Sequence, residues 1–206
     1  MHILITAGPT REYIDPIRYI SNASSGRIGC ALASAAKAAG HRVTLILGPV
    51  AVQPPEADEL VRVTSAAEMF EAVLARFDGC DAFIAAAAVC DYRPAFREEH
   101  KIKKTAGRVT VELERTADIL AHMSRRRKRQ ILVGFCLETE DLERRARDKL
   151  QVKRLDLVVA NGPEAIDAER QDALLIASRG RCERLQGVTK EELAERILAA
   201  VTDRGR

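Results

Sequence analysis

The segment Asp81-Ala82-Phe83-Ile84-Ala85-Ala86-Ala87-Ala88 has one charged residue followed by seven apolar ones. A short apolar run of this kind is typical of a strand that is covered on both faces, as strands of a parallel sheet are. Before it in the chain, residues 66–77 carry apolar side chains at helical spacing, and His2–Thr6 and Arg42–Leu47 are further strand-like runs. We therefore expect helices to alternate with strands around residues 81–88.

The rest of the chain continues this alternation. The patterns predict helices at 26–39, 117–126, 140–153 and 189–201, strands at 60–63, 109–113, 131–135 and 155–160, and a hairpin of 173–177 with 182–186. Such an order predicts a single-domain, Rossmann-like α/β fold over residues 1–206, with a doubly wound, mostly parallel sheet and a C-terminal β-hairpin plus helix. Residues 90–108 are polar and lack periodicity, which predicts a flexible lid loop. Residues 202–206 are expected to fray.

Composition excludes several classes of protein. The 206 residues carry 33 Lys+Arg and 30 Asp+Glu, and only five Phe and three Tyr, so an extended nucleic-acid surface is not expected. Five cysteines without a C-x-x-C pair are typical of reduced thiols in the cytoplasm. The sequence shows no membrane-length apolar run and no targeting segment. We expect a cytoplasmic protein with no membrane or nucleic-acid partner.

Doubly wound sheets bind ligands beyond the carboxyl ends of their strands. The loops after Thr6, Ala87, Phe135 and Ala160 are therefore the expected positions of a site. The first loop ends in Ser24-Ser25-Gly26-Arg27-Ile28-Gly29 at a predicted helix N-terminus. Hydroxyls and free N–H groups there favour an anion, although the two glycines equally suit close packing of the helix on a strand. Both interpretations stay open.

Lysines are scarce and clustered: the chain has eight Lys against 25 Arg. Lys149 and Lys153 share a helix face, which suits either a polyphosphate or solvent. Lys101, Lys103 and Lys104 lie in the predicted lid, where a lysine can close over a phosphate. A G-x-G-x-x-G motif is missing, which disfavours an NAD(P) oxidoreductase. That class, and a non-catalytic nucleotide-binding sensor on the same fold, remain the alternatives.

Longer motifs carry a resemblance to a known family. The stretches 5–12 and 15–26, which read ITAGPTRE and DPIRYISNASSG, are similar to the opening of the phosphopantothenoylcysteine synthetases, the phosphopantothenate–cysteine ligases of coenzyme A biosynthesis. The likeness covers residues 3–201, and its later motifs are Ala86–Val89 with Asp91–Arg93, Lys101–Lys104, Asp118–Leu120, Gly134-Phe135 with Glu138-Thr139, Ala146 with Lys149 and Lys153, and Leu155–Leu157 with Ala160-Asn161.

The resemblance implies a bacterial-type ligase. In that family CTP, carried with Mg²⁺, activates the carboxylate of 4′-phosphopantothenate as an acyl-cytidylate, and the amine of L-cysteine then displaces CMP. By position, Asn22 would contact the acyl intermediate, Arg18 would support that step, and Lys101 would be the lid lysine over the phosphates. The resemblance also implies a homodimer. Many bacterial members carry a decarboxylase domain before the ligase motif, so we expect either a separate phosphopantothenoylcysteine decarboxylase or a longer bifunctional protein of which this chain is a part. The nucleotide site would be built by Gly8, Ser24, Ser25, Gly26, Ala87, Ala88, Asp91, Ala117, Asp118, Ile119, Leu120, Phe135, Lys149 and Lys153.

Overall fold

One mixed sheet organises the fold. The computed structural model describes residues 1–104 and 106–203, and within them eight strands form a sheet in the order β12-β11-β10-β9-β6-β1-β4-β5. Strands β5 to β10 along this order are parallel, whereas β11 and β12 are antiparallel. The predicted mostly parallel α/β fold is confirmed. The strands are β1 (His2–Ala7), β4 (Arg42–Leu47), β5 (Glu59–Arg62), β6 (Ala82–Ala85), β9 (Ile131–Leu137), β10 (Leu157–Asn161), β11 (Arg170–Ala177) and β12 (Cys182–Thr189).

The order of the strands reverses beside β1. From β1 the chain first builds outward through β4 and β5, and it then returns to place β6, β9 and β10 on the other side of β1. In sheets of this kind the loops at the carboxyl ends of the two strands beside the reversal diverge and leave a crevice. The reversal between β1 and β6 therefore positions a ligand site.

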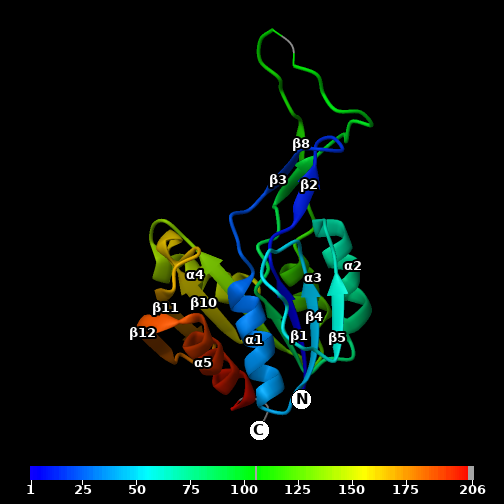
Figure 1. Cartoon of the computed structure of the whole chain (residues 1–206). Helices are drawn as coiled ribbons and strands as arrows, with labels where there is room; N and C mark the ends of the chain where they lie inside the picture. Colours follow the sequence, from blue (N-terminus) through cyan, green and yellow to red (C-terminus); the bar gives the residue numbers. More distant parts are fainter. Residues whose placement is uncertain (105, 204–206) are drawn as a thin grey trace.

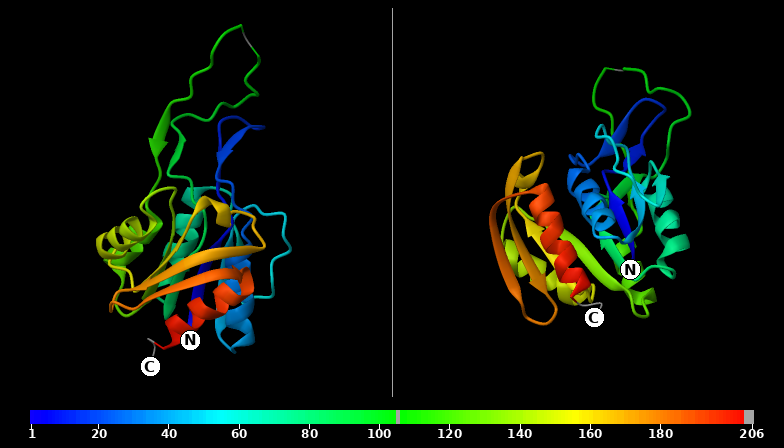
Figure 2. Two further views of the ribbon diagram at one scale, coloured as in Figure 1. Left: turned by 90° about the vertical axis from the view of Figure 1, so that its left-hand side faces the viewer. Right: turned by 60° about the horizontal axis from the view of Figure 1, so that its bottom comes forward.

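Helices cover both faces of the sheet (Figures 1 and 2). One face carries α1 (Arg27–Ala38) and α5 (Lys190–Thr202), which pack side by side over a core that includes Leu32 and Ile197. The other face is covered by α2 (Ala66–Phe77), α3 (Ile119–Arg126) and α4 (Leu142–Val152). A short 3₁₀ helix, Pro163–Ala165, follows β10.

Two small ribbons stand beyond the carboxyl edge of the sheet. β2 (Arg11–Tyr13) pairs with β3 (Tyr19–Ser21), and β7 (Tyr92–Pro94) pairs with β8 (Leu113–Arg115). The described chain between β7 and β8 projects away from the body, and we call residues 92–104 and 106–115 the arm (Figure 1). Met1 and the end of α5 lie at the opposite edge of the molecule (Figure 1).

Several expected boundaries were wrong. The predicted strand 109–113 is not formed before Leu113, because the exposed arm offers no partner until the chain returns to β7. β6 stops at Ala85 instead of Ala88, because the chain bends at Ala87, and Ala88 forms only an isolated bridge with Pro9. α5 includes Thr202, and residues 204–206 of the expected frayed tail lie outside the described residues.

Candidate functional site

Two adjoining cavities open at the carboxyl ends of β1, β6 and β9. The larger has a volume of about 490 Å³ and the smaller about 180 Å³. They share a wall that includes Ala87, Asp91, Phe135 and Lys149. This is the place where the strand order reverses, so the cavities lie where the topology predicts a ligand.

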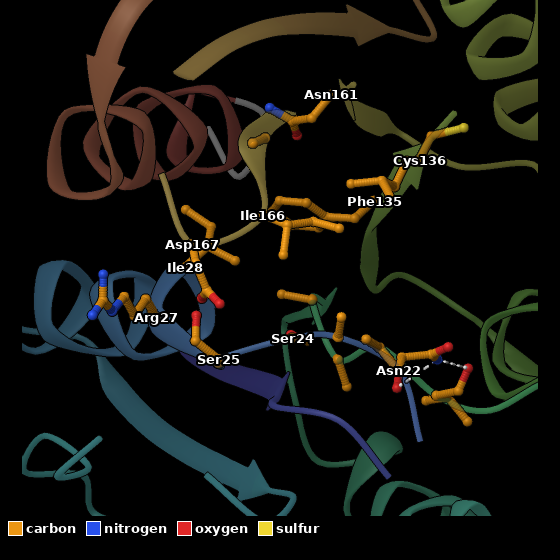
Figure 3. A pocket seen from close by; sticks show the side chains of 18 of the residues that line it. Asn22, Ser24, Ser25, Arg27, Ile28, Phe135, Cys136, Asn161, Ile166 and Asp167 are labelled. Atoms are coloured by element: carbon orange, nitrogen blue, oxygen red, sulfur yellow. Dashed lines mark hydrogen bonds between the residues drawn. The ribbon is translucent and has the colours of Figure 1, made fainter. Parts of the chain in front are cut away.

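The loop after β1 is fastened to the loop after β6. Thr10 is fully buried, its N–H donates to the Ala88 carbonyl, and its hydroxyl accepts the Cys90 N–H at 3.0 Å. Asn22 Nδ2 donates to the carbonyls of Ala88 and Val89, each at 3.0 Å (Figure 3). These bonds hold Asn22 in the wall of the larger cavity.

The N-terminus of α1 forms another part of that wall. Gly26 precedes the helix with φ 78°, a conformation that favours glycine. A Cβ on Gly29 would lie 2.3 Å from the Cβ of Ala7, so close packing on β1 requires this glycine. Ser24 and Ser25 lie at the mouth of the same helix end (Figure 3). Packing accounts for Gly29, and anion binding at this end stays a prediction.

Lys149 and Lys153 lie together in the wall of the smaller cavity. Lys149 Nζ donates to the Phe135 carbonyl at 2.6 Å, and burial lowers the pKa of its ammonium. Lys153 Nζ pairs with Asp118 Oδ2 at 2.7 Å. Asp118 also caps α3 by accepting the Ala121 N–H at 2.9 Å.

The charge of Asp118 is stabilised locally. Burial disfavours the ionised form of this carboxyl, but the hydrogen bonds from Lys153 and from the Ala121 N–H outweigh burial, so the pKa of Asp118 is lowered. The wall of the smaller cavity therefore carries two lysines, Lys149 and Lys153, and two aspartates, Asp91 and Asp118. Lys149 and Asp91 also belong to the shared wall.

Most residues of the predicted site meet at these cavities, and three do not. Arg18 and Lys101 belong to the β2–β3 turn and the arm, outside both walls. Gly8 is buried beneath the site, where its carbonyl accepts the Ala88 N–H at 2.9 Å. The predicted residues that line one or both cavities are Asn22, Ser24, Ser25, Gly26, Ala87, Ala88, Asp91, Ala117, Asp118, Ile119, Leu120, Phe135, Lys149 and Lys153.

The structure adds polar residues that sequence reasoning missed, namely Arg27, Asn161, Gln171 and Lys190 in the wall of the larger cavity. Lys190 Nζ donates to the Ala165 carbonyl at 2.8 Å and to Gln171 Oε1, and burial lowers the pKa of Lys190. The sequence could have placed Asn161 at the site, because this residue ends a strand whose following loop was expected there. No sequence feature points to Lys190, since only the packing of α5 beside α1 brings it to the cavity.

The carboxylates of the cavity walls do not form a metal cage. Within residues 1–104 and 106–203, no three His, Cys, Asp or Glu side chains are grouped to hold a metal ion. Asp91 and Asp167 line the larger cavity as single carboxylates. A magnesium ion carried by a triphosphate takes most of its ligands from phosphate and water, so this donor set fits such an ion.

Within residues 1–104 and 106–203, no helix is both long and apolar enough to span a membrane.

Comparisons with known proteins agree with this architecture. The family model described as "DNA/pantothenate metabolism flavoprotein C-terminal domain" matches residues 1–204. The chain is 52% identical over 165 residues, 80% of its length, to 41% of the coenzyme A biosynthesis bifunctional protein CoaBC of Bacillus subtilis. It is 42% identical over 97% of its length to 57% of a cysteine/cysteine sulfinic acid decarboxylase from an unknown prokaryotic organism.

A solved structure gives the same result. The crystal structure of the C-terminal domain of a coenzyme A biosynthesis bifunctional protein CoaBC superposes with a TM-score of 0.85 at 37% identity, covering 100% of this chain and 96% of that one. The chain spans about half the length of the curated relatives it matches. The predicted family membership is confirmed: this chain belongs to the DNA/pantothenate metabolism flavoprotein C-terminal domain family.

Proposed function

We propose that the chain is a ligase that joins 4′-phosphopantothenate to L-cysteine in coenzyme A biosynthesis, with CTP as co-substrate. The observation that supports the proposal is the pair of cavities with a shared wall, of which one would take the acid and the adjoining one the nucleotide. The names of relatives such as the Bacillus subtilis protein support the pathway. The ligase motifs, read in the sequence, support the reaction.

The proposed chemistry has two steps. A carboxylate oxygen of 4′-phosphopantothenate attacks the α-phosphorus of CTP, the bond to the β-phosphate oxygen breaks, and pyrophosphate leaves. The cysteine nitrogen then attacks the acyl carbon, the carbon–oxygen bond to CMP breaks, and the nitrogen loses a proton as the amide forms. Neither step needs a covalent nucleophile on the protein. Both need positioned reactants and neutralised phosphate charge.

The walls supply groups for both needs. The smaller cavity would take the cytidine, with Phe135 on its apolar side and Lys149 and Lys153 toward the phosphates. The α1 N-terminus at Ser25 and Gly26 offers free N–H groups and a positive dipole end to a phosphate. A phosphate beside Lys149 would restore the charge that burial disfavours.

Asn22 would act at the boundary between acid and nucleotide. Its amide nitrogen is already committed to the Ala88 and Val89 carbonyls, so its side chain is held rigidly in the cavity wall. That leaves the amide oxygen and the fixed loop to orient the acyl group. Magnesium, with Asp91 or Asp167 as its protein-side ligand, would supply charge neutralisation to the triphosphate when bound.

A homodimer completes the proposal. The arm and the neighbouring turn expose large apolar side chains, including Phe96 at 81%, Ile17 at 61% and Val109 at 60%. Exposed apolar groups that gather on one projection are typical of protein interfaces. Since Lys101 lies outside the cavities of its own chain, we propose that the arm carries it to the site in the dimer.

Sedimentation tests the dimer. It should give twice the chain mass for the wild-type protein, and Phe96→Glu should shift the measured mass toward that of the monomer.

Pyrophosphate release tests the function. The protein is incubated with CTP, MgCl₂, 4′-phosphopantothenate and cysteine, and pyrophosphate and the amide product are measured. Both should form in equal amounts, and omission of cysteine should leave a single burst of pyrophosphate per site. ATP in place of CTP measures the nucleotide preference. Carbon dioxide release from cysteine without pyrophosphate would instead favour a decarboxylase, the activity named for one relative.

A further inference from the structure

The turn between β2 and β3 contains a carboxylate that is inaccessible to solvent. Asp15 is 0% exposed. Its Oδ1 accepts the N–H groups of Ile17 and Arg18, each at 2.8 Å, which closes the turn. Its Oδ2 accepts Arg18 Nε at 2.8 Å and Nη2 at 2.5 Å, and also the Ile102 N–H at 3.2 Å. One oxygen therefore serves the turn, and the other links Arg18 to the arm.

Arg18 completes this link from the other side. Its Nη2 also donates to the Ile102 carbonyl at 2.7 Å. Both backbone polar groups of Ile102 are thus held by the Asp15–Arg18 pair, in the way a neighbouring strand would hold them. A second bond, from the Glu98 N–H to the Ile14 carbonyl at 2.8 Å, fixes the start of the same segment.

The turn alone does not explain this arrangement. An asparagine could close the turn through one oxygen, as Asp15 does through Oδ1. The guanidinium needs a second acceptor oxygen, where an asparagine would present an N–H₂ donor, and the bonds are stronger when that oxygen is ionised. Burial opposes ionisation of Asp15, but the bonds from Arg18 and from three backbone N–H groups outweigh it, so the pKa of Asp15 lies well below its usual range.

We propose that Asp15 is a positioning residue that acts through Arg18 and the backbone of Ile102 to hold Lys101, the adjacent residue, in the place it needs above the substrate phosphates. The inference rests on the proposed function, in which Lys101 serves the phosphates. In the same linkage Arg18 holds the Ile102 carbonyl, in addition to any contact that it makes with substrate.

The test compares Asp15→Asn with Asp58→Asn. Asp58 also accepts a backbone N–H, from Val43 at 2.7 Å, and pairs with a cation, Lys37 at 3.0 Å, but it lies at the amino edge of the sheet. Asp15→Asn should lower turnover by about tenfold or more, as expected for a misplaced group, with little change in KM for CTP. Asp58→Asn should leave both constants at wild-type values.

A double-mutant cycle separates positioning from a general structural role. In a Lys101→Gln background, Asp15→Asn should cause no further loss of turnover, because the residue that it positions is already gone. An equal loss in both backgrounds would overturn the inference. Ile102→Pro, which removes the N–H of the arm and leaves the turn intact, should reproduce the effect and serves if Asp15→Asn does not fold.

Hydrogen exchange tests the linkage without any activity. In Asp15→Asn, peptides that contain Glu98 and Ile102 should exchange faster, whereas Asp58→Asn should not change them. Unchanged exchange in Asp15→Asn would show that Asp15 does not hold the arm. If the wild-type protein releases no pyrophosphate with CTP or ATP, the proposed function fails, and the exchange result still decides whether the linkage exists.

Discussion

Gly29→Ala probes the contact between α1 and β1 beneath the site. A Cβ at this position would lie 2.3 Å from Ala7 Cβ and 3.0 Å from Ala7 Cα, against about 3.4 Å or more for an ordinary contact. Because the contact is with backbone and a methyl group, no side-chain rotation relieves it, and α1 must move by more than about 1 Å. Overpacking costs about 1–3 kcal/mol, and a contact that is more than about 1 Å too short against Ala7 belongs to the upper part of that range, about 2–3 kcal/mol.

Helix propensity acts in the opposite direction. Alanine is favoured over glycine inside a helix by about 1 kcal/mol. The net effect of Gly29→Ala is thus a loss of about 1–2 kcal/mol in the free energy of unfolding, or roughly 2–8 °C in Tm for a chain of this size. Ser34, which is exposed on the same helix, provides the matched control. There the alanine variant should be more stable than the glycine variant.

Thermal unfolding followed by circular dichroism measures all of these variants. The same Gly29→Ala protein should also bind CTP more weakly, because a displaced α1 moves Ser25 and Gly26 away from the cavity. A variant as stable as wild type would refute the packing argument. Weakened nucleotide binding without loss of stability would instead show that Gly29 serves an anion.

Three further perturbations address the site. Lys153→Gln removes the partner of Asp118 and should raise KM for CTP about tenfold, the cost of one charged hydrogen bond. Arg147→Gln on α4, the helix that Lys153 caps, should leave KM unchanged, and equal KM values in the two variants would contradict this. Asn22→Asp places a carboxylate against two carbonyls and should slow amide formation at least tenfold while acyl-cytidylate accumulates in quenched reactions; full activity would remove Asn22 from the mechanism. Since the pKa of Asp15 is lowered, its stabilisation is complete above the ordinary value of 3.8 and is lost below it, so the difference in Tm between wild type and Asp15→Asn should shrink as pH falls below about 3.8; a constant difference down to the lowest measurable pH would exclude this.

Local sequence patterns were sufficient to predict the bounds of the elements that bury a whole face in the core. The bounds of β4 and α2 match those predicted, because the spacing of apolar residues is local information. The β2–β3 and β7–β8 ribbons could not be predicted in the same way. Their strands have three residues each, too few to show alternation, and each exists because of the strand it pairs with.

The same limit applies to the site. Phe135 and Ala87 could be located because the carboxyl ends of parallel strands meet at one edge. Lys190 could not, since it lies in the first turn of the last helix and no rule of loops points to that position. Asp15 was part of the recognised motif at 15–26, and its partner Ile102 lies 87 residues later, in the Lys101–Lys104 motif. Only the structure shows that a hydrogen bond joins these two motifs.

The position of the chain ends limits how the site can cooperate with another domain. Met1 and the end of α5 lie at the edge of the sheet opposite the cavities (Figure 1). A domain fused at either end would be separated from the cavities by a whole strand, about 20 Å for six residues. Within one chain, an intermediate passed between such domains would travel through solvent around the sheet, without a shared wall to channel it. Its transfer would then depend on its bulk concentration, and an added trap enzyme should intercept it.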